Sequence, residues 1–338
     1  MLEGMAEAEA KYGLKSALRF TPNDNRGMSR SPRLREGHHW ERMLDCFVRV
    51  AGLGADMVSI ESTGGKDLHD EALIKCDIEG VIFALSVAAV RDMKFLWGHL
   101  TEICGLHGAL PAGDSACGFG NTAMVMAAQR LIPRAFAAVV RVLSGIRTLV
   151  ALECGATGPG KDCAYENPFL KAVTGAPVSG EGKTAACAHL SPLGNISAAY
   201  ADLWSNESVP NIRLSGSLAP VACLESLVYD CRLFNQAAKE GQALLMRNWL
   251  VDSDAGLDSQ AYIFRPENVI ALAKVMISGR SYYDSAKKTA AATADLLLEA
   301  GRTGRIRIGR MEGRYLENIV KTVEAMPDQE DEIIEQIL

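Results

Sequence analysis

The sequence predicts an α/β fold of the TIM (β/α)8-barrel type, lacking its N-terminal βα unit and followed by extra C-terminal helices. Short apolar runs alternate with helical stretches between residues 15 and 242, which gives seven βα units. Several runs are apolar along their whole length, as is typical of strands buried on both faces of a parallel sheet. An eight-stranded barrel needs one more strand, expected before residue 1 or within the N-terminal segment. A doubly wound open sheet is the alternative fold.

Apolar periodicity gives the order of the elements. Strands are expected at residues 15–20, 55–61, 80–86, 110–117, 149–154, 182–188 and 211–217. A helix is expected after each strand, at residues 36–51, 69–76, 90–107, 122–147, 168–174, 195–203 and 222–242. Pro133 should break the longest of these helices, because proline lacks an N–H group and its ring clashes with the preceding turn. Further helices at 266–278, 281–300 and 314–325 indicate a catalytic barrel over residues 1–245 and a helical extension over residues 246–338 packed on it.

Composition limits the class of protein. Of the 338 residues, 48% are hydrophobic and 22% are charged, which suits a globular protein with a sizeable core. The net charge of −6 argues against nucleic-acid binding, which favours a basic surface. Two arginine clusters are more simply explained as solvated faces or as a docking surface for an acidic partner. They are Arg26, Arg30, Arg33 and Arg35, and Arg302, Arg305, Arg307, Arg310 and Arg314.

The sequence predicts a cytoplasmic protein that does not enter a membrane. Residues 1–7 are acidic and lack the basic and apolar regions of a signal peptide. The longest uncharged apolar stretch, residues 81–90, is too short to span a bilayer. Nine cysteines, an odd number in a long chain, favour reduced thiols.

Three predicted strands end in polar clusters that hold possible metal ligands. Glu61 ends one strand, Cys117 ends another, and Cys154 ends a third, which runs on toward Cys163. In a parallel barrel these ends meet at one mouth, where such folds build their sites. A carboxylate and two thiolates there would bind zinc and leave one coordination position open for a substrate. Position alone leaves Cys154 and Cys163 as alternatives, and Cys187 also lies at a strand end.

Other motifs are weaker. Cys46, Cys76, Cys104, Cys223 and Cys231 lie on helical stretches and are expected to be buried as small hydrophobes. Residues 155–162 match part of a P-loop, but an aspartate stands where Ser or Thr should hold magnesium. Residues 182–184 match its other half, but Pro177 replaces the leading glycine. Nucleotide binding is therefore disfavoured.

Five motifs closely resemble methanol:corrinoid methyltransferases, the methanol-activating subunits of their system. They are IESTGGK (60–66), GDSACGF (113–119), GPGKDCAYE (158–166), GKTAACAH (182–189) and DLWSNES (202–208), and the resemblance runs from about Tyr12 to the C-terminus. It implies a TIM barrel in which zinc activates methanol for methyl transfer to a corrinoid carried by a separate protein. Matched by motif, the implied zinc ligands are Glu61, Cys117 and Cys163, with Cys163 preferred because it lies inside a motif. Family members have a longer N-terminal region than this chain.

Hydroxide is a poor leaving group, and two thiolates with one carboxylate give the zinc site a net charge of −1. A general acid would therefore help, and the candidates are Asp114, Asp162, Glu166 and His189. Glycines suit the close approach of a bulky corrinoid, and the candidates are Gly64, Gly65, Gly158 and Gly160. We expect a homo-oligomer or a complex with the corrinoid protein. The alternatives are a zinc-dependent barrel methyltransferase or lyase with another substrate, and a truncated, non-catalytic homologue that binds the corrinoid protein.

Overall fold

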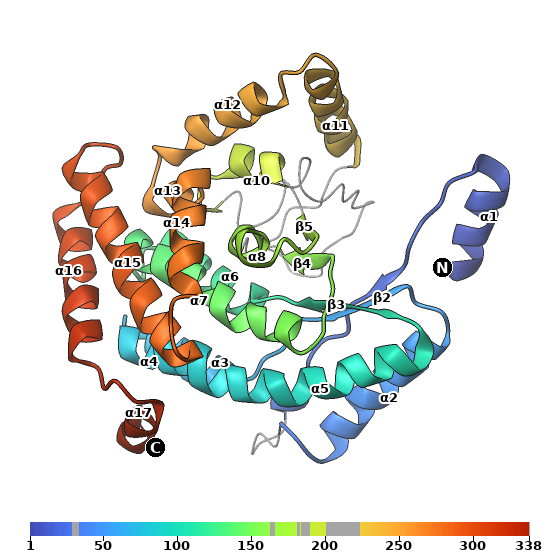
Figure 1. Cartoon of the computed structure of the whole chain (residues 1–338), viewed down its shortest axis with the longest axis horizontal. Helices are drawn as coiled ribbons and strands as arrows, with labels where there is room; N and C mark the ends of the chain where they lie inside the picture. Colours follow the sequence, from blue (N-terminus) through green and yellow to red (C-terminus); the bar gives the residue numbers. More distant parts are fainter. Residues whose placement is uncertain (29–33, 163–165, 181–182, 184–189, 201–223, 338) are drawn as a thin grey trace.

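The computed structural model describes residues 1–28, 34–162, 166–180, 183, 190–200 and 224–337. Within these ranges the fold is a mostly helical α/β arrangement, with short strands in the middle and helices around them (Figure 1). One sheet is parallel in the order β1 (Arg19–Phe20), β2 (Met57–Ile60) and β3 (Leu110–Asp114). A second parallel pair joins β4 (Gly160–Asp162) to β5 (Val178–Gly180), and β4 packs beside β3. The described strands thus follow one another in chain order, and closure into an eight-stranded barrel stays a prediction.

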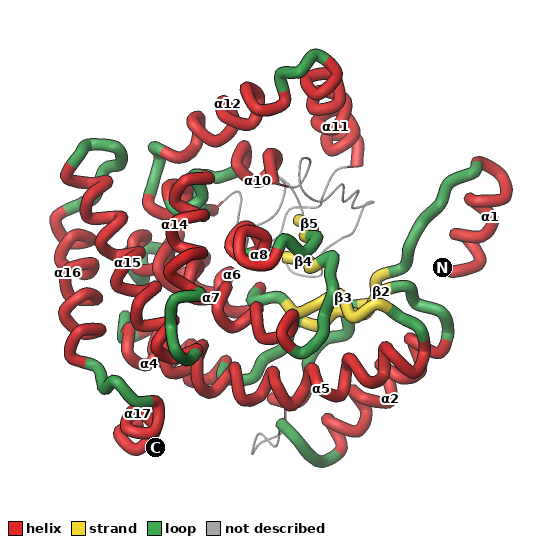
Figure 2. Tube along the Cα trace, viewed as in Figure 1, coloured by secondary structure: helices red, strands yellow, loops and turns green. Residues whose placement is uncertain are grey.

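Helices follow the strands and cover the sheet, as Figure 2 shows. They are α2 (His38–Gly52), α3 (Lys66–Ile74), α5 (Ala89–His107), α6 (Cys117–Ala128), α7 (Arg134–Glu153), α8 (Asn167–Thr174) and α10 (Gly194–Tyr200), and α1 (Leu2–Tyr12) precedes β1. One hydrophobic cluster packs Phe47 of α2 and Trp97 of α5 against Ile60 of β2. Because Ile60 is fixed by this core, the residue that follows it also has a defined position.

The end of the chain is helical, as expected. It forms α11 (Leu224–Lys239), α12 (Ala243–Ala255), α13 (Ser259–Tyr262), α14 (Pro266–Met276), α15 (Tyr282–Arg302), α16 (Arg310–Ala325) and α17 (Glu330–Ile337). α15 packs on α7 and α16, and residues such as Phe136 of α7 and Leu297 of α15 share one hydrophobic cluster. The predicted division at residues 245 and 246 falls inside α12 and stays a prediction.

Two predicted strands are helical. Residues 149–154 form the last turn of α7 and its C-cap, and residues 80–86 lie in α4 (Ile78–Phe83) and the π-helical segment η2 (Ala84–Ala88). A continuous apolar run fits a fully buried helix as well as a buried strand, so apolar periodicity could not separate them. The strand predicted at 182–188 lies outside the described residues except for Lys183, and the one at 211–217 lies wholly outside them. The predicted break at Pro133 is confirmed, since α6 ends at Ala128 and α7 begins after Pro133.

α7 is the central helix of the fold. By length and composition it could cross a membrane, but 94% of its apolar window is buried inside the protein, as in a core helix. It also carries two fully buried arginines, Arg141 and Arg147. A buried guanidinium requires partners, and those of Arg147 lead to the candidate site.

Candidate metal centre

Glu61 and Cys117 lie at the same edge of the sheet. β2 and β3 are parallel neighbours with Ile60 opposite Asp114, so their carboxyl ends are side by side. Glu61 directly follows β2 and forms a bridge with Asn23, and its side chain is 41% exposed. Cys117 is partly buried and begins α6, three residues beyond the end of β3. A carboxylate and a sulfur thus leave adjacent strand ends.

The Cys117 sulfur has neighbours that suit a ligand. Asn121 Nδ2, one turn along α6, donates to Cys117 Sγ over 2.9 Å. A helix N-terminus and an N–H donor beside a reduced cysteine are both features that suit a metal-ligating sulfur. Cys117 is disulfide-bonded, and Cys46, Cys76, Cys104 and Cys154 are free, so none of these four is its partner. Metal binding through the Cys117 sulfur would therefore require the reduced protein.

Lys161 brings β4 to the same edge. Its Nζ lies 3.9 Å from Glu61 Oε1, and it stands two residues before Cys163. The backbone of Asp162 ends β4, whereas its side chain, Cys163 and His189 lie outside what the structure describes. Among the described residues, no three His, Cys, Asp or Glu side chains are grouped to hold a metal ion. The metal-ligand set thus stays a prediction.

Asp114, predicted as a proton donor, is buried and fully engaged. It accepts hydrogen bonds from the backbone N–H of Ser62 (3.1 Å) and of Ser115 (2.8 Å). It also accepts from Trp97 Nε1 (2.9 Å) and forms an ion pair with Arg147 (3.2 Å). Both oxygens of this buried carboxylate are already occupied by four donors, which favours a positioning role over proton donation to a substrate.

Glu166 has a similar environment. Its side chain is fully buried, and Oε1 accepts from the backbone N–H of Ala116 (2.6 Å) and from Thr148 Oγ1 (3.2 Å). Ala116 precedes Cys117, and Glu166 lies three residues after Cys163. This carboxylate therefore joins the two cysteine-bearing segments, which also favours a positioning role.

Arg147 is a residue of the site that was not predicted from the sequence. Its guanidinium is fully buried and donates to the carbonyl oxygens of Ser62 (2.6 Å) and Ser115 (3.1 Å), to the Ser62 hydroxyl and to Asp114. It also lies over the Phe119 ring, 4.5 Å from the centroid. The signal that could have found it is an arginine within a long apolar helix, since such a charge is kept only where partners meet it.

Arg26 corrects an expectation. The sequence predicts that it belongs to a solvated face or a docking surface for an acidic partner, but its side chain is fully buried between two carboxylates. It binds Asp24 (2.7 Å) and Asp92 (2.8 Å), and Asp24 in turn accepts from the backbone N–H of Thr63 (2.8 Å). This buried ion triad, Asp24–Arg26–Asp92, braces the loop that follows Glu61.

The glycines predicted to approach a corrinoid are packed against protein. A Cβ at Gly64 would clash with the Asp92 side chain, and one at Gly65 (φ +80°) would lie 2.7 Å from a backbone oxygen of η2. A Cβ at Gly158 would lie 2.8 Å from the backbone before β5, and one at Gly160 3.4 Å from a side chain of α8. These contacts leave no room for a larger residue at Gly64, Gly65 and Gly158, whereas the contact at Gly160 is an ordinary one. Corrinoid approach at these four glycines stays a prediction.

Cys154, the alternative metal ligand, lies elsewhere. It caps the C-terminus of α7 and packs beside the cluster that holds Trp97. Burial, and then the charge of Glu153, raises the pKa of the Cys154 thiol, which disfavours the thiolate that zinc requires. Its environment therefore indicates a structural thiol.

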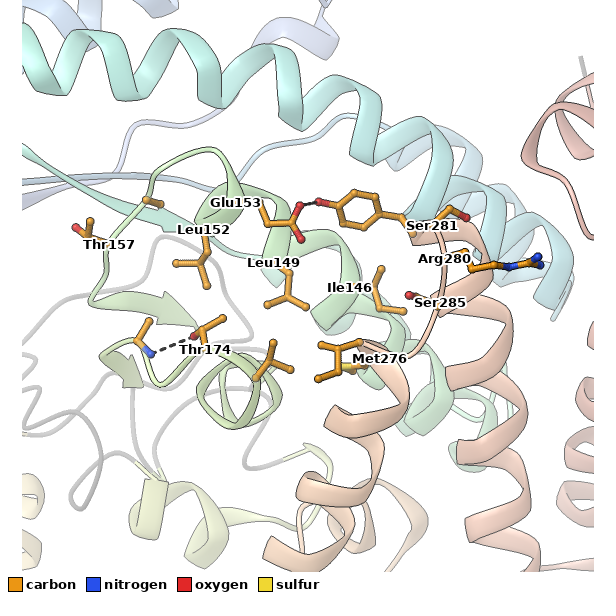
Figure 3. A pocket seen from close by; sticks show the side chains of 16 residues that line it. Ile146, Leu149, Leu152, Glu153, Thr157, Thr174, Met276, Arg280, Ser281 and Ser285 are labelled. Atoms are coloured by element: carbon orange, nitrogen blue, oxygen red, sulfur yellow. Dashed lines mark hydrogen bonds between the residues drawn. The ribbon is translucent and has the colours of Figure 1, made fainter.

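A cavity of about 650 Å³ opens beside the same end of α7 (Figure 3). Ile146, Leu149 and Met276 give it apolar walls, and Tyr282 on its rim donates to the Glu153 carboxylate. None of its lining residues is a predicted site residue. The candidate metal centre is therefore a separate region at the carboxyl ends of β2 and β3.

Parallel strands with reactive groups at their carboxyl ends define an α/β protein that builds its site at this edge.

The family model of the methanol-cobalamin methyltransferase B subunit matches residues 1–338. The chain is 35% identical to the methanol–corrinoid protein co-methyltransferase of Methanosarcina barkeri (strain Fusaro / DSM 804), over 99% of this chain and 73% of that protein. The crystal structure of the methanol:cobalamin methyltransferase complex from Methanosarcina barkeri matches with a TM-score of 0.87 at 35% identity, over 98% of this chain and 73% of that one. The chain belongs to the methanol-cobalamin methyltransferase B subunit family.

Proposed function

We propose that the protein transfers the methyl group of methanol to the Co(I) corrinoid of a partner protein, with zinc held by Glu61, Cys117 and Cys163. The observation that carries the proposal is the family match over residues 1–338. Glu61 and Cys117 at neighbouring strand ends support it, because they bring a carboxylate and a sulfur to one edge.

The donor set fits zinc. One carboxylate with two thiolates is a ligand set that zinc accepts while keeping a fourth position open. Cys117 is disulfide-bonded, so zinc binding through its sulfur requires reducing conditions. The raised pKa of Cys154 disfavours it as the third ligand, and Cys163 is preferred because it lies inside the GPGKDCAYE motif.

Bound zinc would act as a Lewis acid that polarises the C–O bond of methanol. Lys161, 3.9 Å from Glu61, places a positive charge beside the ligand set and offsets its net negative charge. Asp114 and Glu166 hold backbone N–H groups, which leaves Asp162 and His189 as the proposed proton donors. Corrinoid approach along the loops of Gly64, Gly65, Gly158 and Gly160 is part of the same proposal.

The wider architecture belongs to the same proposal. We propose a TIM-type barrel over residues 1–245 with the helical extension 246–338 packed on it, acting in the cytoplasm. The corrinoid protein would dock at the carboxyl ends of the strands, where Glu61 and Cys117 lie.

Methyl transfer is tested with reduced protein, methanol and Co(I) cobalamin, followed by the absorbance of methylcobalamin. Chelation should abolish the reaction, and zinc but not magnesium should restore it, because magnesium prefers oxygen ligands. Undiminished transfer after complete metal removal would contradict the proposal. Transfer from a thiol or an amine in place of methanol would favour an enzyme with another substrate. Corrinoid-protein binding without zinc or turnover would favour the non-catalytic alternative.

A further inference from the structure

We infer that Arg147 is a positioning residue that, together with Asp114, fixes the segments carrying the metal ligands before any metal binds. The inference rests on the proposed zinc site. It concerns how the ligands are held rather than which reaction follows, and it assigns a role to a residue that touches neither zinc nor methanol.

The first step is how Arg147 and Asp114 share the two strand ends. Arg147 donates to the carbonyl oxygens of Ser62 and Ser115, over 2.6 and 3.1 Å. Asp114 accepts from the backbone N–H groups of the same two residues, over 3.1 and 2.8 Å. In each segment, Asp114 therefore holds the N–H group of the serine and Arg147 holds its carbonyl oxygen, and the two side chains form an ion pair with each other.

The second step is where these two residues lie in the chain. Ser62 directly follows Glu61, and Ser115 lies two residues before Cys117. Fixing the backbone at Ser62 and Ser115 limits how far the carboxylate and the sulfur can move apart. Because Arg147 and Asp114 are fully buried, water does not compete for these hydrogen bonds.

The third step brings in the remaining segment. Thr148, next to Arg147 on α7, donates to Glu166 Oε1, which also accepts from the N–H of Ala116. One turn of α7 is thus linked to both cysteine-bearing segments as well as to the segment after Glu61. Zinc binds sulfur and oxygen ligands only within narrow distance ranges, so a backbone shift at any of these segments weakens binding.

Arg141 provides a matched control. It lies on the same helix, is also buried, and donates to Ser191 Oγ (3.2 Å) while lying over the Phe264 ring. Losing the Arg141 side chain should cost stability as losing Arg147 does, because both are buried guanidinium groups. Among the described residues, Arg147 bonds to Ser62 and Ser115, near Glu61 and Cys117, whereas Arg141 bonds to Ser191.

The test compares Arg147→Lys, Arg141→Lys and wild type, all reduced, by zinc competition with a chromophoric chelator and by the absorption spectrum after Co²⁺ substitution. Arg147→Lys should lower zinc affinity about 10- to 100-fold and shift the Co²⁺ bands, as expected when support of metal ligands is lost. Arg141→Lys should leave both unchanged. Ser62→Ala removes only the hydroxyl that accepts from Arg147, so it should fold and lower affinity about two- to tenfold.

Unchanged zinc affinity and Co²⁺ bands in Arg147→Lys, or in Ser62→Ala if Arg147→Lys does not fold, would overturn the inference. An equal loss in Arg141→Lys would overturn it too, since the effect would then be general destabilisation. Wild-type protein that binds zinc but transfers no methyl group would defeat the proposed function alone. Wild-type protein that binds no zinc would defeat both.

Discussion

Replacing Cys117 with alanine is expected to abolish stoichiometric zinc binding and to lower methyl transfer from methanol by at least about 10²-fold. Loss of a residue that only supports a metal ligand costs about 10- to 100-fold in metal affinity or activity, and loss of the ligand itself should cost more. Cys117 begins α6 beside Glu61, and it is disulfide-bonded unless the protein is reduced. The substitution removes one of the two proposed thiolates and leaves a cavity too small to disrupt a partly buried position. Zinc content by mass spectrometry and methylcobalamin formation measure the two effects.

Cys154→Ala is the matched control. This thiol is free, caps α7 and has a raised pKa, so its loss should leave zinc content and methyl transfer unchanged. A Cys117→Ala protein that keeps one zinc and full activity would contradict the ligand assignment. If Cys154→Ala instead lost zinc and activity, Cys154 rather than Cys163 would be the third ligand, as position along the sequence alone allows.

Replacing Arg26 with methionine is expected to destabilise the fold by about 3–5 kcal/mol, because it leaves two carboxylates buried without their cation. Burial lowers the pKa of Arg26, but its bonds to Asp24 and the charge of Asp92 outweigh burial and raise it. Arg26 is therefore charged throughout the accessible pH range. Because Thr63 binds Asp24, the loop after Glu61 should loosen and zinc affinity should fall as well.

Urea denaturation measures the loss in the free energy of unfolding of Arg26→Met, and Arg49→Met is the matched control. Arg49 is exposed and its ion pair with Asp45 spans 3.9 Å, so that change should stay within about 0.5 kcal/mol of wild type. If Arg26→Met lost less than about 1 kcal/mol, the buried triad would not be the brace that its contacts indicate.

Strands and helices with a clear period were predictable from the sequence. The helix predicted at 90–107 matches α5, and the strands predicted at 55–61 and 110–117 contain β2 and β3. The errors at 80–86 and 149–154 share one cause, which is that both segments are short apolar runs, mostly buried, without the periodic polar face that marks a surface helix. Tertiary burial, which a single sequence does not report, decided those segments.

The site divides in the same way. The placement of Glu61 and Cys117 at neighbouring strand ends was predictable because each follows a recognisable strand, and their role as ligands stays a prediction. The support around them was not, since Arg147 meets Ser62 across 85 positions and Arg26 meets Asp92 across 66. In the sequence, Asp114 and Glu166 cannot be distinguished from acidic residues that donate a proton. Only the buried N–H groups that they bind indicate that they position the backbone.

Zinc K-edge X-ray absorption tests the zinc site most directly. The account predicts two sulfur scatterers at about 2.3 Å and oxygen at about 2.0–2.2 Å in reduced, zinc-loaded protein. One sulfur should be lost in Cys163→Ala and none in Cys154→Ala. A zinc shell of nitrogen and oxygen alone, or a sulfur count that Cys163→Ala leaves unchanged, would contradict it.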